Sequence, residues 1–358
     1  MASSRPKICI LLGPKKYALE VPSGKTSILN VVLDDLEPNS TLYNEPTRIP
    51  WVKSFDAFLD FEMWDLPGGR YDVENLDNLD LQRVGACIFV IDAQAFQGDN
   101  TDQARRMAQA MFKMYDLNPK TTFEIFIHKV DGMSDTYRLD VQQDLRNRVN
   151  DELNDLVDME GLDDYVFPPM SYHFTSIYQS SVYEALSKVI SRLMPCQGAL
   201  ERLLDTLCTH SSFDKAYVFD LASKLYFATD STPGDSATHE LCTEYIDLHW
   251  EMDQIYSREL QDDGQDTISL PSQISNGAIQ ECARQKHPLK RQPVRSTFSG
   301  CVTLSNGITM AHWELSDEIA LIARVGSIVI AQSSAAVEKN VEHFRDAVVQ
   351  IRNLEATR

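Results

Sequence analysis

The sequence has 358 residues, of which 43% are hydrophobic and 24% charged. A chain of that length usually exceeds a single hydrophobic core, so two domains are expected. With 33 Lys and Arg against 53 Asp and Glu, the net charge is −20. This excludes a broad nucleic-acid-binding face, which needs cations to neutralise phosphates, but it leaves room for a local pocket that binds one nucleotide.

The same sequence predicts a cytoplasmic protein that does not insert into a membrane. Its seven cysteines are odd in number and never spaced as C-x-x-C, which favours reduced thiols. The apolar run Ile8–Leu12 is too short for a signal-peptide core or a membrane span. Ala2 is not the glycine that myristoylation needs, and the chain ends in EATR without a prenylation motif. Any membrane attachment is therefore expected to come through a partner.

Residues 7–194 alternate strand and helix signals. The apolar runs expected to form strands are Ile8–Leu12, Phe58–Met63, Ala86–Asp92, Phe123–Ile127 and, more weakly, Tyr172–Thr175. Continuous apolar runs separated by helical patterns predict an α/β fold with a doubly wound, mostly parallel sheet. The stretch MPCQG at 194–198 breaks the last helical pattern, so we predict one domain over 1–194 and a second over 195–358.

The second half predicts a different α/β layer. Its expected elements in chain order are a helix at Leu200–Leu207, strands at Ala216–Leu221 and Leu225–Thr229, a helix at Glu240–Ile255, a strand at 318–325 and a helix at 337–351. The acidic, polar stretch 257–273 is expected to be a disordered insert. Asn306-Gly307 between two alternating runs predicts a hairpin with a type I′ turn.

The stretch LLGPKKYALEVPSGKTSI ends like a phosphate-binding loop. In the usual G-x-x-x-x-G-K-[S/T] pattern the first glycine lies five positions before the second, whereas Gly13 lies eleven positions before Gly24. In such a loop backbone N–H groups wrap the phosphates, while Lys25 would reach the outer phosphates and Thr26 would hold Mg²⁺. A lone GKT at this spacing is more often an ordinary helix start, so the interpretation needs support from elsewhere.

Three further motifs supply that support. FEMWDLPGG matches the D-x-x-G element of GTPases, in which Asp65 would reach Mg²⁺ through water and the Gly68 amide would sense the γ-phosphate; the alternative is a simple Pro-Gly turn. FEIFIHKVDG offers Asp131, whose carboxylate would accept from the N1–H and amino group of guanine, a donor pair that adenine lacks. FTSIY adds Thr175 and Ser176 at the end of another strand.

Each of these motifs is weak alone, since a solvated His-Lys-x-Asp turn or a Pro-Gly turn explains it equally well. Together they occur in the correct order, each at the carboxyl end of a predicted parallel strand, the edge where such sheets bind ligands. We therefore favour a GTPase over coincidence. An unrelated P-loop ATPase or small kinase is disfavoured by the guanine-type HKVD motif.

The motifs WDLPG, VIDAQ, FEIFIHKVDG, FTSIY, AYVFDLASKLYFATDS and ELCTEYID resemble the Rag GTPases, specifically the C/D branch and its fungal counterpart. The resemblance implies a Ras-like P-loop GTPase domain followed by a roadblock (longin-like) domain, with GTP or GDP and Mg²⁺ as ligands. It also implies a heterodimer with an A/B-type Rag through the second domains. Such a pair docks on a membrane scaffold complex at the lysosome or vacuole and signals amino-acid sufficiency to the target-of-rapamycin kinase complex.

The resemblance carries specific roles onto this sequence. Thr47 aligns best with the switch threonine that closes over Mg²⁺, and Thr41 is the second choice. The implied metal ligands are Thr26, Thr47 and Asp65. The implied nucleotide-binding residues are Gly13, Ser23, Gly24, Lys25, Thr26, Ser27, Thr47, Gly68, His128, Lys129, Asp131, Thr175, Ser176 and Ile177. Trp64 belongs either to a switch-region partner surface or to the core.

Two departures from the family pattern stand out. Deleting Tyr17–Pro22 restores the standard loop spacing as GPKKSGKTS, so these residues are an insert; a splice error in the gene model, an expression artefact and a genuine insertion stay open. Gly69 stands where the family commonly has the Gln that orients the attacking water. No catalytic residue is therefore assigned, and we expect either a slow GTPase or a nucleotide-occupied scaffold with negligible hydrolysis.

Overall fold

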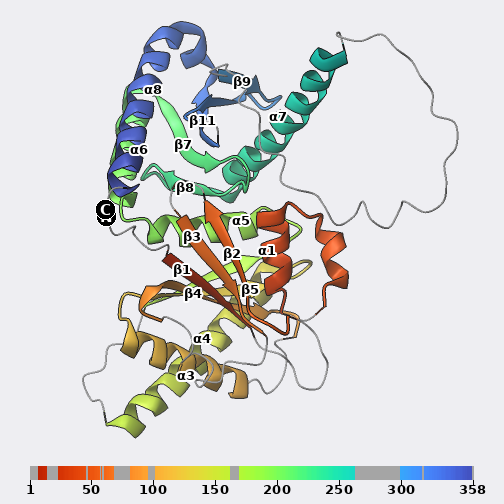
Figure 1. Ribbon diagram of the computed structural model, residues 1–358, viewed down its shortest axis with the longest axis vertical. Helices are drawn as coiled ribbons and strands as arrows, with labels where there is room; N and C mark the ends of the chain where they lie inside the picture. Colours follow the sequence, from red (N-terminus) through yellow and green to blue (C-terminus); the bar gives the residue numbers. More distant parts are fainter. Residues whose placement is uncertain are drawn as a thin grey trace, which may run out of the picture.

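The computed structural model describes residues 7–13, 23–45, 47–56, 58, 60–67, 81–95, 101–161, 169–262, 299–316 and 318–356. These residues form two β-sheets, each covered by helices (Figure 1). The insert Tyr17–Pro22, the switch residues Gly68 and Gly69, and residues 263–273 of the acidic stretch lie outside the described ranges.

The first sheet has the order β2-β3-β1-β4-β5-β6. Its strands are β1 (Lys7–Leu12), β2 (Trp51–Asp56), β3 (Asp60–Asp65), β4 (Val84–Asp92), β5 (Thr122–His128) and β6 (Met170–Thr175). All neighbouring pairs are parallel except β2 with β3, which confirms the doubly wound, mostly parallel prediction. The edge strand β2 was not predicted, because Trp51, Val52 and Ser54 are exposed and the strand has no continuous apolar run.

Helices cover both faces of this sheet and explain its continuous apolar strands. Along β4, Cys87 and Phe89 pack against one pair of helices, while Ile88 and Val90 pack against the other. The first pair is α3 (Thr101–Leu117) and α4 (Asp135–Glu160), and the second is α1 (Lys25–Asp34) and α5 (Ser181–Leu193). Two short 3₁₀ helices, η1 (Pro38–Tyr43) and η2 (Leu81–Arg83), lie in the connections. Because alternate residues of a strand face opposite sides, both sets must be apolar.

The second sheet is antiparallel, with the order β8-β7-β11-β10-β9. Its strands are β7 (Phe213–Asp220), β8 (Tyr226–Thr229), β9 (Ser299–Thr303), β10 (Ile308–Glu314) and β11 (Ile319–Gly326). The helices α6 (Gln197–Ser211) and α8 (Ser327–Ala356) pack on one face, and α7 (Ser236–Asp262) packs on the other. One hydrophobic cluster runs from the first sheet through α5 to the second sheet, so the two halves share packing.

Two sequence-based expectations for this half are wrong in detail. The hairpin at Asn306-Gly307 forms, but its turn is not type I′: the Gly307 amide donates to the Leu304 carbonyl (2.9 Å) and only Gly307 has positive φ. This is a type I turn followed by a left-handed glycine, which a three-residue hairpin loop uses. Residues 257–262, expected to be disordered, continue α7. The break between α5 and α6 falls at 194–196, and the domain boundary placed there stays a prediction.

Within the described ranges, no helix has both the length and the hydropathy that crossing a bilayer requires.

Candidate nucleotide-binding site

The end of the expected phosphate loop lies at the carboxyl edge of the first sheet. Gly13 follows β1, and Ser23 and Gly24 lead directly into α1. Gly24 has φ of 101°, a left-handed conformation that favours glycine, and a Cβ there would lie 2.7 Å from the His128 ring. The close approach of this backbone to His128 is therefore possible only because position 24 lacks a side chain.

Three oxygen-bearing side chains meet beside Lys25. The Thr26 hydroxyl donates to Asp65 Oδ2 (2.5 Å), the Thr47 hydroxyl donates to the same atom (2.9 Å), and the two hydroxyls are 2.7 Å apart. Asp65 is fully buried, and its second oxygen, Oδ1, has no hydrogen-bond partner among the residues that the structure describes. A buried carboxylate oxygen left in this way, next to two hydroxyls, fits the hard oxygen donors that Mg²⁺ prefers.

The two candidate switch threonines occupy different places. Thr47 lies against Asp65, as described above, whereas the Thr41 hydroxyl donates to the Pro38 carbonyl (2.8 Å) inside its own 3₁₀ turn. The structure therefore brings Thr47, not Thr41, to the expected metal position. Its role as a ligand stays a prediction.

The HKVD and TS motifs meet at the ends of β5 and β6. His128 Nδ1 lies 3.0 Å from the Thr175 hydroxyl, and the Ser176 hydroxyl donates to Asp131 Oδ1. The Ser176 oxygen also accepts from the Tyr178 amide (3.0 Å), which fixes the hydroxyl that holds the Asp131 carboxylate. Three of the predicted motifs are therefore in contact: Gly24 of the phosphate loop packs against His128 of HKVD, and His128 contacts Thr175 of the TS motif.

Burial sets the charge of this site. It lowers the pKa of the Lys25 ammonium, an effect that the nearby Asp65 carboxylate opposes. It also lowers the pKa of His128 to about 4, with the Lys129 ammonium acting in the same direction. His128 is therefore a neutral imidazole at pH 7, and a buried Lys25 ammonium gains most from an anionic ligand such as a phosphate.

The remaining predicted residues lie around this centre. Ser27 is half-buried in the first turn of α1, and Ile177 packs against the core from the loop after β6. Trp64 packs against the core, and its indole N–H donates to Glu62 (3.0 Å), which favours the core interpretation. The prediction missed Asp92, the last residue of β4, which pairs with Lys129. The sequence feature that could have identified Asp92 is its place at the end of a predicted strand, in the motif VIDAQ.

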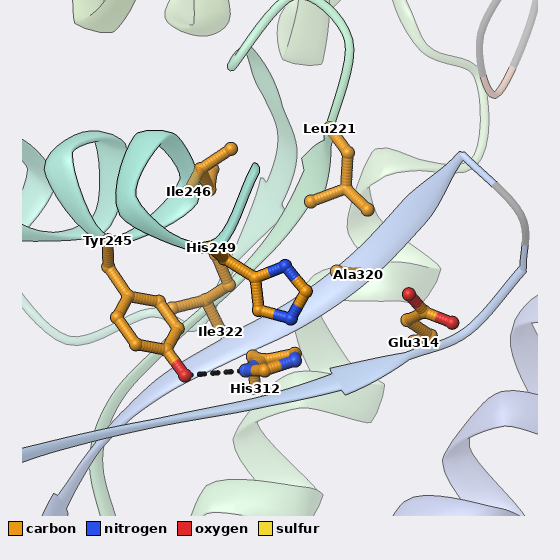
Figure 2. A pocket seen from close by; sticks show the side chains of 8 residues that line it. All are labelled: Leu221, Tyr245, Ile246, His249, His312, Glu314, Ala320 and Ile322. Atoms are coloured by element: carbon orange, nitrogen blue, oxygen red, sulfur yellow. Dashed lines mark hydrogen bonds between the residues drawn. The ribbon is translucent and has the colours of Figure 1, made fainter. Parts of the chain in front are cut away.

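A separate pocket lies between α7 and the second sheet (Figure 2). The hydroxyl of Tyr245 is 2.6 Å from His312 Nδ1, and the His249 and His312 rings meet nearly at right angles with centroids 4.5 Å apart. Its lining comprises Leu221, Tyr245, Ile246, His249, His312, Glu314, Ala320 and Ile322. Burial, with His249 acting in the same direction, lowers the pKa of His312 to about 4, so this imidazole is neutral at pH 7.

Residues 10–246 match the Gtr1/RagA G protein conserved region. The chain belongs to the Gtr1/RagA family of G proteins. This family membership confirms the resemblance read from the motifs, including its C/D branch, and it supports GTPase activity in general terms.

Several Gtr1/RagA-family relatives align over most of this chain. GTP-binding protein gtr2 of Schizosaccharomyces pombe is 34% identical over 97% of this chain and 98% of its own length. Human Ras-related GTP-binding protein C is 38% identical over 73% of this chain, which spans 62% of that relative. GTP-binding protein GTR2 of Saccharomyces cerevisiae is 35% identical over 72% of this chain and 76% of its own length.

Proposed function

We propose that this chain is a guanine-nucleotide switch and one subunit of a Rag-type heterodimer. In this proposal it binds GTP or GDP with Mg²⁺ and pairs with an A/B-type Rag. The pair is recruited through a scaffold to the lysosomal or vacuolar membrane, where it signals amino-acid sufficiency to the target-of-rapamycin kinase complex. The names of the relatives, which describe GTP-binding proteins, support the nucleotide part of the proposal.

The proposal rests on two groups of side chains at the same edge of the first sheet: the loop that carries Asp131, and the oxygen cluster of Asp65, Thr26 and Thr47. Ser176 holds the Asp131 carboxylate, while Asp65 presents beside Thr26 an oxygen that is unpaired within the described part of the chain. Asp131 would read the base, Lys25 would neutralise phosphate, and Thr26, Thr47 and Asp65 would hold the metal. Bound Mg²⁺ would neutralise charge on the phosphate oxygens.

Asp131→Asn tests guanine selection. The substitution replaces an acceptor with an amide, so it should invert the preference from GTP to xanthosine triphosphate by at least roughly a hundredfold. Equilibrium binding of both nucleotides measures the change, with Asp135→Asn, an exposed carboxylate in the first turn of α4, as the matched control. Unchanged GTP affinity with no gain for the xanthine nucleotide would reject the assignment.

A nucleotide-occupied scaffold with negligible hydrolysis is the alternative function, favoured by Gly69 at the position of the usual Gln. Single-turnover hydrolysis of GTP separates the two functions. A slow but measurable release of phosphate that Thr26→Asn abolishes supports the switch. Release no faster than from that variant supports the scaffold.

Heterodimerisation is assigned to residues 195–358, the second predicted domain. Hydrogen–deuterium exchange of the full chain, alone and with an A/B-type Rag, should show new protection in this half. Protection confined to residues 7–194 would contradict the assignment.

A further inference from the structure

The loops that follow β4 and β5 are joined by a reciprocal contact. The Lys129 ammonium donates to Asp92 Oδ2 (2.8 Å), and the Gln94 side-chain amide donates back to the Lys129 carbonyl (3.2 Å). Behind them the Ala93 amide donates to the His128 carbonyl (2.8 Å). The residues that precede Asp131 are therefore tied to the neighbouring loop through both side chain and backbone.

Asp92 is the centre of this contact. Its side chain is only 9% exposed, whereas that of Lys129 is 29% exposed. The second oxygen, Oδ1, accepts from the Gln94 amide (2.9 Å) and the Ala95 amide (3.2 Å), so the carboxylate also shapes its own loop. A charge-assisted hydrogen bond at a largely buried acceptor is stronger than an exposed ion pair.

The backbone of Lys129 needs such a restraint. Its φ is 61°, in the left-handed region that residues other than glycine adopt at a cost. Asp131 comes two residues later, and its carboxylate must point at the base edge within a few tenths of an ångström to form two hydrogen bonds. Ser176 holds the carboxylate from one side, and the Asp92–Lys129 pair holds the backbone that carries it.

We propose that Asp92 is a positioning residue for guanine recognition, acting through the ammonium of Lys129 on the loop that presents Asp131. This inference rests on the proposed nucleotide function. Because Asp92 touches the loop and not the expected base position, it acts on how well Asp131 is aimed. Its loss should reduce discrimination between bases and not only overall affinity.

Asp92→Asn in the full-length chain isolates the ionic part, since the amide oxygen can still accept from the two loop amides. We expect roughly tenfold faster dissociation of a fluorescent GDP analogue. Dissociation of the inosine analogue, which lacks the exocyclic amino group that Asp131 reads, should change by less than threefold. The preference for guanine over hypoxanthine therefore falls, whereas a merely structural defect would weaken both nucleotides equally.

Lys129→Met removes the ammonium from the same pair and keeps the hydrogen bonds that Asp92 accepts from the Gln94 and Ala95 amides. The double variant Asp92→Asn/Lys129→Met should behave like Lys129→Met alone, because the second substitution removes nothing further. Glu152→Gln, which breaks the α3–α4 ion pair with Arg105 (3.1 Å) away from the site, should leave both dissociation rates unchanged. If Asp92→Asn does not fold, a Lys129→Met variant that keeps its base preference overturns the proposal.

Equal acceleration for the two nucleotides, additive effects in the double variant, or a GDP dissociation rate within twofold of the original each overturn the role of Asp92. The Asp131→Asn variant keeps this failure apart from failure of the proposed function. If Asp131→Asn switches the preference to the xanthine nucleotide while Asp92→Asn changes nothing, only the positioning role is wrong.

Discussion

In the first half most buried polar side chains lie at or just after the carboxyl ends of the strands, whereas the second half also buries polar side chains inside its strands and in α7. Asp65 and His128 end β3 and β5, but Lys215 and His312 lie inside β7 and β10. Glu124, which is buried inside β5, is paired with Arg192 (2.8 Å).

The buried charged groups of the two halves also differ in how completely they are paired. Lys215 donates to the carbonyls of Asp230 (3.0 Å) and Thr232 (2.6 Å), and it lies 3.2 Å from the Asp230 carboxylate. That carboxylate accepts in addition from the Ala216 amide (2.9 Å). Asp65, in contrast, keeps an oxygen that no described residue pairs with. We call a cluster closed when its polar groups are all paired, and such a cluster stabilises the fold. A cluster that leaves a polar atom unpaired is open, and it is suited to binding a ligand.

The largest expected effect tests the closed cluster. Asp230→Ala leaves the Lys215 ammonium buried without its carboxylate, which should lower the free energy of unfolding by about 3–5 kcal/mol. Urea denaturation monitored by circular dichroism measures the loss. Asp214→Ala, at the position before Lys215 in β7, removes a carboxylate that pairs at the surface with Arg324 and should cost less than about 1 kcal/mol. Equal losses in the two variants would show that the closed cluster stabilises the fold no more than a surface ion pair does.

Lys25→Ala tests the open site. It should weaken GDP and GTP binding by roughly a hundredfold, since the buried ammonium is expected to contact phosphate directly. Nucleotide dissociation measured with a fluorescent GDP analogue gives the change, and thermal unfolding without nucleotide should stay close to that of the original chain. Lys188→Ala on the surface of α5 serves as the matched lysine control. A Lys25→Ala protein that unfolds at a lower temperature but binds nucleotide as tightly as before would show the ammonium to be structural.

Acid should weaken the second sheet through its buried histidines. Burial lowers the pKa of His239 and of His312 to about 4, below the ordinary value of 6.5. The unfolded chain then binds more protons, so their stabilising contribution is complete above pH 6.5 and is lost as the pH falls toward 4. Each histidine should cost roughly 2 kcal/mol of stability at pH 5.

His239→Phe sharpens this test. His239 lies among Tyr217, Phe219 and Tyr226, and within the described ranges neither ring nitrogen has a hydrogen-bond partner. An apolar ring there should flatten the decline in melting temperature between pH 7 and pH 5. His210→Gln, at an exposed position in α6, should leave the decline unchanged. A decline as steep in His239→Phe as in the original chain would remove His239 from the explanation.

The smallest effect concerns the seam between the two halves. The Tyr226 amide of β8 donates to the Ser187 hydroxyl of α5 (2.9 Å), and both groups are buried. Ser187→Ala leaves that amide unsatisfied and should cost about 1–2 kcal/mol of unfolding free energy. Ser191→Ala removes a hydroxyl that donates within its own helix, to the Lys188 carbonyl, and should cost less. If the two costs agree, the seam bond adds nothing to stability.

The sequence by itself determined the fold class, the family, and the order of the motifs along the chain with the strands that they follow. Apolar runs of strand length, helical periodicity and motif chemistry are local properties, so they survive without any knowledge of contacts. Strand β2 escaped prediction for the same reason: an exposed edge strand needs no apolar run. The hairpin at Asn306-Gly307 was predicted correctly, but its turn type was not, because the turn type depends on the backbone angles of each residue.

Only the tertiary structure decided which side chains meet. It brought Thr47 rather than Thr41 to Asp65, it joined Asp92 to Lys129 across a separation of 37 residues, and it closed Lys215 on Asp230. The Asp92–Lys129 and Lys215–Asp230 pairs have no sequence signature, because the fold brings together residues from separate segments of the chain. Burial then fixes their charge, as in the neutral His128, by removing the water that would otherwise solvate the ion.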